Sequence, residues 1–234
     1  QFYEVEINGD EVWAASVPSD QVANRLGIYQ FDGTGWIVHN TKNGLPSNIA
    51  VALQRDNDGQ LWVGTWGHGL IILDSQNNWR HFNQSNSVLK GIPTNPNFVV
   101  VSDIQRDADG NMWLVNIQAG LAVVNGFPRR QGHLNTQATL GLAPGRDMGK
   151  LAISPDDLKW IGTAQDGLIM FDDGGTPFEG GDERTVAINT GFDSRLGSDH
   201  VTAVYSNQAG VVWVGTDNGL NRVSYRYDKA TGDF

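Results

Sequence analysis

Short apolar runs alternate with polar turns along the whole chain. The clearest runs are rich in β-branched residues and occupy residues 49–53, 99–104 and 201–205. Such composition is typical of strands that are buried on both faces. Turns rich in Asp, Asn and Gly follow these runs at residues 56–59, 107–110 and 207–210. Because Asp and Asn bond to nearby backbone and Gly accepts a positive φ, each turn predicts a tight hairpin.

A tryptophan recurs at the same place in this pattern. Trp13, Trp62, Trp113, Trp160 and Trp213 follow one another at intervals of 49, 51, 47 and 53 residues. A small residue comes three positions after each tryptophan, and a glycine followed by Leu or Ile then opens a further strand. These glycine pairs are Gly27-Ile28, Gly69-Leu70, Gly120-Leu121, Gly167-Leu168 and Gly219-Leu220. The repeating unit is therefore about fifty residues long.

A weaker apolar run, clearest at residues 36–39 and 79–82, adds a fourth strand to the unit. Four short strands per unit predict an all-β fold of β-propeller blades. A parallel solenoid is the alternative, but its repeat is usually shorter and lacks Asp/Asn-Gly hairpins. Stacked blades cover each other's faces, so we expect the five tryptophans to be structural and buried between blades, each contributing roughly 2–3 kcal/mol.

The predicted blades span approximately residues 1–48, 49–96, 97–145, 146–199 and 200–234, all within one propeller segment. The segments 44–48 and 91–95 link consecutive blades. Residues 2–7 resemble the first strand of the first blade, and the last blade stops before a convincing fourth strand. We therefore expect an incomplete ring whose remaining blades come from sequence outside this chain.

The composition of the chain excludes some classes of binding partner and some kinds of chemistry. The chain has 234 residues, a formal net charge of −10, and no cysteine. This charge opposes binding to nucleic acid or to an anionic membrane, and the lack of cysteine excludes disulfides and thiol chemistry. No apolar run approaches the roughly 18 residues that span a bilayer, so no direct membrane insertion is expected.

The complete sequence motif of the second unit resembles the two-component-regulator propeller repeat. It runs Gly44-Leu45-Pro46-Ser47-Asn48, then Asp58 to Thr65, then Gly69-Leu70, and residues 211–222 are similar to it. The third and fourth units depart from the repeat at Val115-Asn116 and at residues 155–157.

That resemblance implies about seven blades per ring and a place outside the cytoplasm of a bacterium, in the periplasm or at the cell surface. It implies either a periplasmic sensor of hybrid two-component systems, which detects oligosaccharides, or a PorZ-type protein of the type IX secretion system.

Propellers bind ligands chiefly at one mouth, where the loops joining second to third strands meet the links between blades. Trp66 lies outside the tryptophan period, and an exposed indole there could stack on a sugar; packing on its own loop is the alternative. The candidate ligand-binding residues in these loops are Trp66, His68, Gln118, Arg146, Gln165, Asp166, Asp199, His200, Asp217 and Asn218. The insert at residues 17–26 falls on the same side.

Enzyme and metal motifs are missing from the sequence. The Asp pairs in the turns could hold calcium, but the EF-hand spacing is absent and a hairpin accounts for them. His-Glu-x-x-His, Gly-x-Ser-x-Gly and phosphate-binding glycine loops do not occur, so no catalytic residue, metal or cofactor is predicted.

The leading functional hypothesis is a non-catalytic, extracytoplasmic propeller that recognises a glycan. The alternatives are a protein-protein interaction scaffold of a cell-surface or secretion complex, and a propeller-based polysaccharide lyase or hydrolase. A glycan site requires a stacking aromatic among amides and carboxylates in one mouth, and a scaffold requires an apolar exterior patch. A lyase requires a base within hydrogen-bond reach of its substrate.

Overall fold

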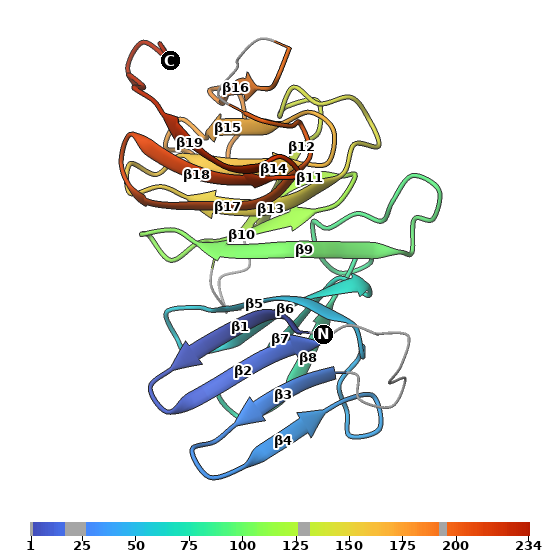
Figure 1. Cartoon of the computed structure of the whole chain (residues 1–234). Coiled ribbons are helices and arrows are strands. Elements are labelled where there is room, and N and C mark those ends of the chain that lie inside the picture. The colour runs from blue at the N-terminus through green and yellow to red at the C-terminus, as the bar shows by residue number, and fades with distance from the viewer. Residues whose placement is uncertain (1, 17–26, 126–131, 192–195) are drawn as a thin grey trace.

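The computed structural model describes residues 2–16, 27–125, 132–191 and 196–234, and these ranges contain 19 β-strands and no helix. The strands form successive antiparallel sheets (Figure 1). The first contains β1 (Phe2–Asn8), β2 (Glu11–Ser16), β3 (Gly27–Phe31) and β4 (Trp36–His39), and the second β5 (Ala50–Arg55), β6 (Leu61–Gly67), β7 (Leu70–Leu73) and β8 (Trp79–Phe82).

The remaining strands continue the same order. The third group is β9 (Val99–Arg106), β10 (Met112–Asn116), β11 (Gly120–Val124) and β12 (Gly132–Thr136). The fourth is β13 (Met148–Ile153), β14 (Lys159–Thr163), β15 (Leu168–Asp172) and β16 (Arg184–Ile188), and the fifth is β17 (Val201–Gln208), β18 (Val211–Thr216) and β19 (Gly219–Ser224). The all-β propeller fold predicted from the repeat is confirmed, including the missing fourth strand of the last blade.

The first strand of every blade packs against the first strand of the next. Contacts run from β1 to β5, then to β9, β13 and β17, which is the arrangement of inner strands around a propeller axis. Among the described residues, β1 and β17 do not pair with each other, so the five blades do not close a ring by hydrogen bonds.

One pairing was not expected from the sequence. The end of β6 pairs with β9, with Trp66 opposite Val100 and Gly67 opposite Val99, and this joins the second and third blades into one sheet. Trp66, predicted in a loop, therefore lies within a strand. The prediction was wrong because this pairing is between blades and has no local sequence signal.

The hydrophobic core is divided into layers between neighbouring blades. Each layer contains the period-marking tryptophan of one blade packed against the next blade. Trp13, Trp62, Trp113 and Trp160 are at most 2% exposed, as predicted.

Trp213 corrects that prediction, because it is 37% exposed. It pairs with Tyr205 on β17, which is 58% exposed, so both side chains lie on the face of the last blade turned away from the fourth. The outer face of the first blade is likewise open, with Ile7 and Trp36 exposed. The expectation that inner strands are buried on both faces fails for β17 for the same reason: no described blade covers this side.

The glycine of the Gly-Leu pair has a steric role where a fourth strand is present. Gly167 has a φ of +77°, and a Cβ there would come within 2.3 Å of the Ile188 carbonyl oxygen on β16. Gly219, in the blade without a fourth strand, has a φ of +103° but open space around it. The recurring glycine thus allows the fourth strand to approach closely.

Candidate functional site

The loops between second and third strands and the links between blades lie at one end of the sheets. Gly69 N donates to Val99 O over 2.8 Å, and Gly167 N donates to Asp199 O over 3.0 Å. Each bond joins the turn of one blade to the start of the next inner strand. This end of the propeller, the mouth, contains the candidate residues predicted from the sequence.

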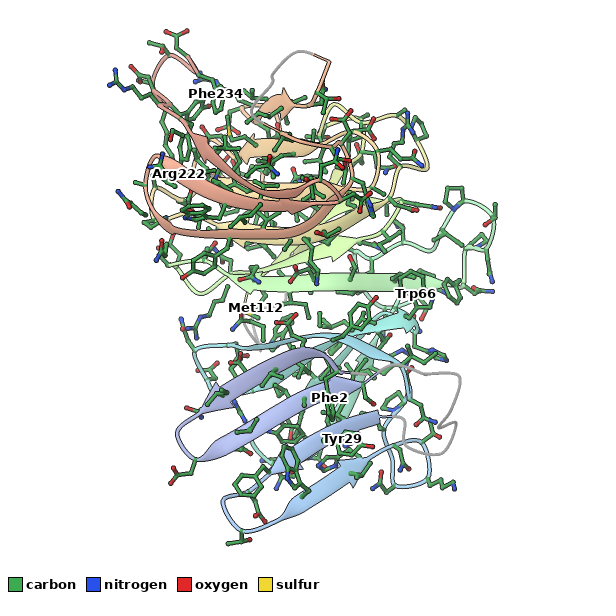
Figure 2. The ribbon with its side chains drawn as sticks, viewed as in Figure 1. Phe2, Tyr29, Trp66, Met112, Arg222 and Phe234 are labelled. Carbon is green, nitrogen blue, oxygen red and sulfur yellow. The ribbon has the colours of Figure 1, made fainter. Side chains whose placement is uncertain are left out.

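Trp66 presents an indole at the mouth that is 46% exposed. Its backbone is fixed at two places, by a hydrogen bond from Trp66 N to Ile49 O over 3.1 Å and by pairing with Val100. Figure 2 shows Trp66 beside one end of β9. His68 is exposed nearby, its carbonyl oxygen hydrogen-bonded to the ring of His81. A rigid backbone with an exposed ring is suited to stacking on a flat apolar surface.

Most polar candidates are engaged in pairs with their neighbours. Gln118 Nε2 donates to Asp147 Oδ1 over 2.9 Å and thereby bridges the third and fourth blades. Arg146 forms an ion pair with Asp166, at 3.3 Å between Nε and Oδ2, and a hydrogen bond with Gln165. The structure therefore brings Arg146, Gln165 and Asp166 together in one cluster.

The fifth-blade candidates form a second group. His200 Nδ1 lies 2.8 Å from Asp217 Oδ2, and both side chains are about half exposed. Asp199 accepts hydrogen bonds from Thr190 N and Oγ1 at 2.7 and 2.9 Å. Asn218 Nδ2 donates to Gly197 O over 2.6 Å. General-base catalysis uses a histidine oriented by an aspartate in this way. In this structure the His200–Asp217 contact joins the segment before β17 to the turn after β18.

The Asp-rich turns are structural. Asp56 accepts bonds from Asp58 N, Gln60 N and Trp62 Nε1, at 3.0, 2.9 and 2.9 Å. Asp107 accepts a hydrogen bond from Trp113 Nε1 in the same way, over 2.8 Å. These donors occupy the oxygens that a calcium ion would require. Within the described ranges, no group of three or more His, Cys, Asp or Glu side chains is placed to hold a metal.

A charged cluster near the propeller axis was not found from the sequence. Glu4 on β1 interacts electrostatically with Asp103 on β9 and Lys150 on β13, and Lys150 Nζ lies 6.0 Å from the Tyr3 ring centroid. Burial, with a smaller contribution from Asp103, raises the pKa of Glu4 to about 7, while Lys150 opposes the shift. Burial also raises the pKa of Asp103.

This cluster predicts a pH dependence of stability. The folded state holds the Glu4 proton more tightly than the unfolded chain, in which the pKa is 4.5. Between pH 4.5 and about 7 the folded state therefore binds more protons than the unfolded chain. The free energy of unfolding should then fall by up to about 3 kcal/mol as the pH rises from about 5 to about 8.

Urea unfolding across this pH range measures the effect. Glu4→Gln, which stays neutral, should make the slope shallower, and the exposed Glu179→Gln serves as the matched control. A Glu4→Gln profile as steep as that of the wild type would contradict the prediction.

Comparison with known families supports the sequence resemblance. Residues 44–67 match the family described as Two component regulator propeller, so the resemblance is confirmed for this repeat. No curated protein matches the chain in sequence.

Solved structures share the fold at low identity. The extracellular domain of BT4673 from B. thetaiotaomicron, described as a hybrid two component system, is 17% identical with a TM-score of 0.72 over 96% of this chain and 27% of its own. PorZ, a surface component of the type-IX secretion system of Porphyromonas gingivalis, is 21% identical with a TM-score of 0.73, covering 95% of this chain and 32% of its own.

A third structure, YCF48 from Cyanidioschyzon merolae, is 13% identical with a TM-score of 0.59, over 96% of this chain and 67% of its own. YCF48 has also been solved bound to D1 peptide; that structure is 12% identical, with a TM-score of 0.57 over 94% of this chain and 62% of its own. The chain thus spans about a third or less of the length of the BT4673 and PorZ structures. Among the described residues, no helical segment has the length and hydropathy of a membrane span.

Proposed function

We propose that this chain is part of a non-catalytic, extracytoplasmic propeller that recognises a neutral oligosaccharide at its mouth. The observation that carries the proposal is the exposed Trp66 indole on a rigid strand end, at the end of the propeller that also bears the paired amides and carboxylates. Carbohydrate sites combine an aromatic stacking surface with such hydrogen-bonding groups. The net charge of −10 favours a neutral ligand over an anionic one.

The location outside the cytoplasm is supported by the matched structures, which are an extracellular domain of a two component system and a bacterial surface component. A protein partner is the second candidate ligand, since a structure of similar fold binds a peptide. The open apolar faces of the first and last blades do not by themselves favour a scaffold, because Trp213 has the repeat position at which other tryptophans pack against a blade.

A matched pair of tryptophan substitutions tests the glycan proposal. Trp66 and Trp36 are both exposed, at 46% and 58%, but Trp36 follows the hairpin between β3 and β4, at the opposite end of the sheets. After a glycan array identifies an oligosaccharide, calorimetry should show roughly three- to tenfold weaker binding for Trp66→Ala and no change for Trp36→Ala.

Two outcomes would overturn the proposal. Either no neutral oligosaccharide binds, or binding is unaffected by Trp66→Ala, His68→Ala and Asp217→Ala alike. A protein partner would then replace the glycan as the proposed ligand.

A further inference from the structure

The period-marking tryptophans differ in what covers their rings. Trp13 stacks on His39 with ring centroids 5.2 Å apart, Trp113 contacts Phe171 at 6.2 Å, and Trp160 contacts Tyr225 at 4.7 Å. Trp62 is buried as deeply as these three, yet no ring-to-ring contact involves it within the described residues. Its layer, between the second and third blades, contains Phe82, but among the described residues no ring of the third blade covers Trp62 as Phe171 of the fourth blade covers Trp113.

The strand register identifies the residue of the third blade that corresponds to Phe171. In the fourth blade, Phe171 pairs with the residue before Trp160 and covers Trp113 of the preceding blade. In the third blade, the equivalent residue, which pairs with Met112 before Trp113, is Val124. Val124 is smaller than phenylalanine by most of an aromatic ring. It is also only half-buried, whereas Phe171 is 0% exposed.

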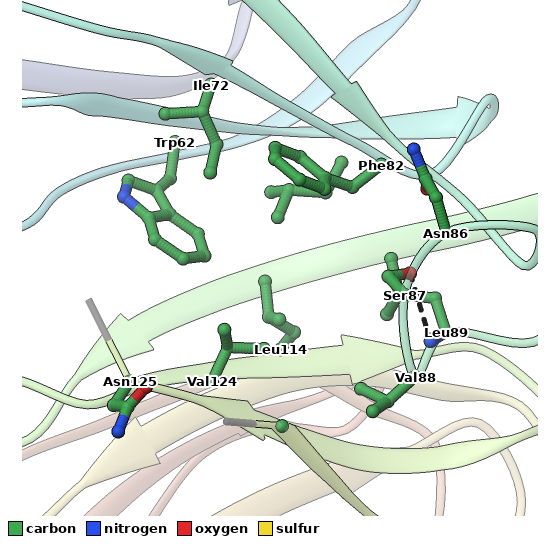
Figure 3. Close-up of a pocket in the computed structure, with 12 residues that line it drawn as sticks. Trp62, Ile72, Phe82, Asn86, Ser87, Val88, Leu89, Leu114, Val124 and Asn125 are labelled. Carbon is green, nitrogen blue, oxygen red and sulfur yellow. Dashed lines mark hydrogen bonds between the residues drawn. The ribbon is translucent and has the colours of Figure 1, made fainter. Parts of the chain in front are cut away.

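A cavity of about 110 Å³ occupies this position. Figure 3 shows the Trp62 ring and Phe82 on one side of it and Leu114, Val124 and Val88 on the other. An engineered apolar cavity of roughly 150 Å³ stays dry and binds benzene, so a volume of this size holds about one ring. Water gains little here because the inner lining offers few hydrogen-bonding groups.

The outer rim of the cavity is polar and reaches the surface. Asn86 is exposed, and Ser87 and Asn125 beside it are half-buried. Ser87 Oγ donates to Asn83 O over 2.6 Å and accepts from Leu89 N over 3.3 Å, which fixes one side of the opening. Among the described residues, no ionisable side chain lines the cavity, so these residues offer a charged ligand no compensation for its lost hydration.

We propose that this cavity is a binding site for one aromatic ring of a small, uncharged molecule, which takes the place that Phe171 fills in the next layer. The ring would lie against Trp62 and between Leu114 and Val124, with any hydroxyl group at the Asn86 and Ser87 rim. The cavity lies between two blades, and the proposal does not depend on glycan recognition.

Binding of p-cresol tests the proposal directly. We expect saturable binding by calorimetry, and nuclear Overhauser contacts from the p-cresol ring to the methyl groups of Leu114 and Val124. 4-Methylcyclohexanol, which matches the size but is not planar, should bind at least about fivefold more weakly, because an aromatic ring gains from offset or edge-to-face contact with Trp62.

Val124→Phe places the missing ring on the chain and should weaken p-cresol binding at least tenfold. The matched control, Trp66→Ala, changes the mouth and should leave p-cresol binding unchanged. The proposal is overturned if p-cresol does not bind, if its contacts lie elsewhere, if 4-methylcyclohexanol binds equally well, or if a folded Val124→Phe binds as tightly as the wild type. The contacts in the wild-type protein decide the question even if Val124→Phe does not fold.

Discussion

Trp113→Ala is expected to lower the free energy of unfolding by about 3–5 kcal/mol. The Trp113 side chain is 0% exposed and packs between the third and fourth blades, where it contacts the Phe171 ring at 6.2 Å. Its Nε1 donates to Asp107 over 2.8 Å, and Lys159 Nζ lies 4.5 Å from its ring centroid. Alanine would leave a large cavity and remove all three interactions. Urea or thermal unfolding of the purified chain measures the change.

Trp213→Ala is the matched control at the same repeat position. Because Trp213 is 37% exposed and faces away from the fourth blade, its loss should cost about 1 kcal/mol or less in this chain. In a longer protein with a blade packed on this face, the cost should rise to that of Trp113→Ala. Equal losses for the two variants in this chain would show that the exposed face is packed in solution.

The sequence predicts the blades well because the signals that form them are local. Turns such as residues 56–59 contain the residues that close a hairpin, and Trp62 marks the strand position that packs against the next blade. The strands at residues 36–39 and 79–82 were predicted with the bounds observed. The exposure of Trp213 could not be predicted, since the repeat specifies that a blade packs there but not where that blade comes from.

The candidate site was less predictable because it depends on contacts between blades. Trp66 was identified as unusual from its sequence position, but its pairing with Val100 is a contact between distant segments. Glu4, Asp103 and Lys150 come from three blades and meet only near the axis. The cavity beside Val124 depends on a difference in side-chain volume between equivalent layers, which requires the exact register of the strands.

The fourth blade contains a buried charge that the repeat does not explain. Lys159 has a side chain that is 0% exposed, next to the turn at residues 155–157 that departs from the Asp-Gly pattern. Its Nζ lies 3.1 Å from both Asp157 Oδ1 and Asp173 Oδ2, and the Asp173 side chain is 4% exposed. In this blade, Trp160 Nε1 donates its hydrogen bond to Ser154 Oγ, over 3.2 Å, rather than to an aspartate. Lys159 and Asp173 therefore form an ion pair that is almost completely shielded from solvent.

Lys159→Met is expected to lower the free energy of unfolding by about 3–5 kcal/mol, because removing one member of a buried pair leaves the other charge without compensation. Asp173→Asn added to Lys159→Met should recover at least about 1.5 kcal/mol, since the neutral amide no longer opposes burial. A double-mutant cycle measured by urea unfolding gives this coupling. If Asp173→Asn costs as much in the Lys159→Met background as in the wild type, the two residues do not interact, and the loss in Lys159→Met comes from the other contacts of Lys159, with Asp157 and the Trp113 ring.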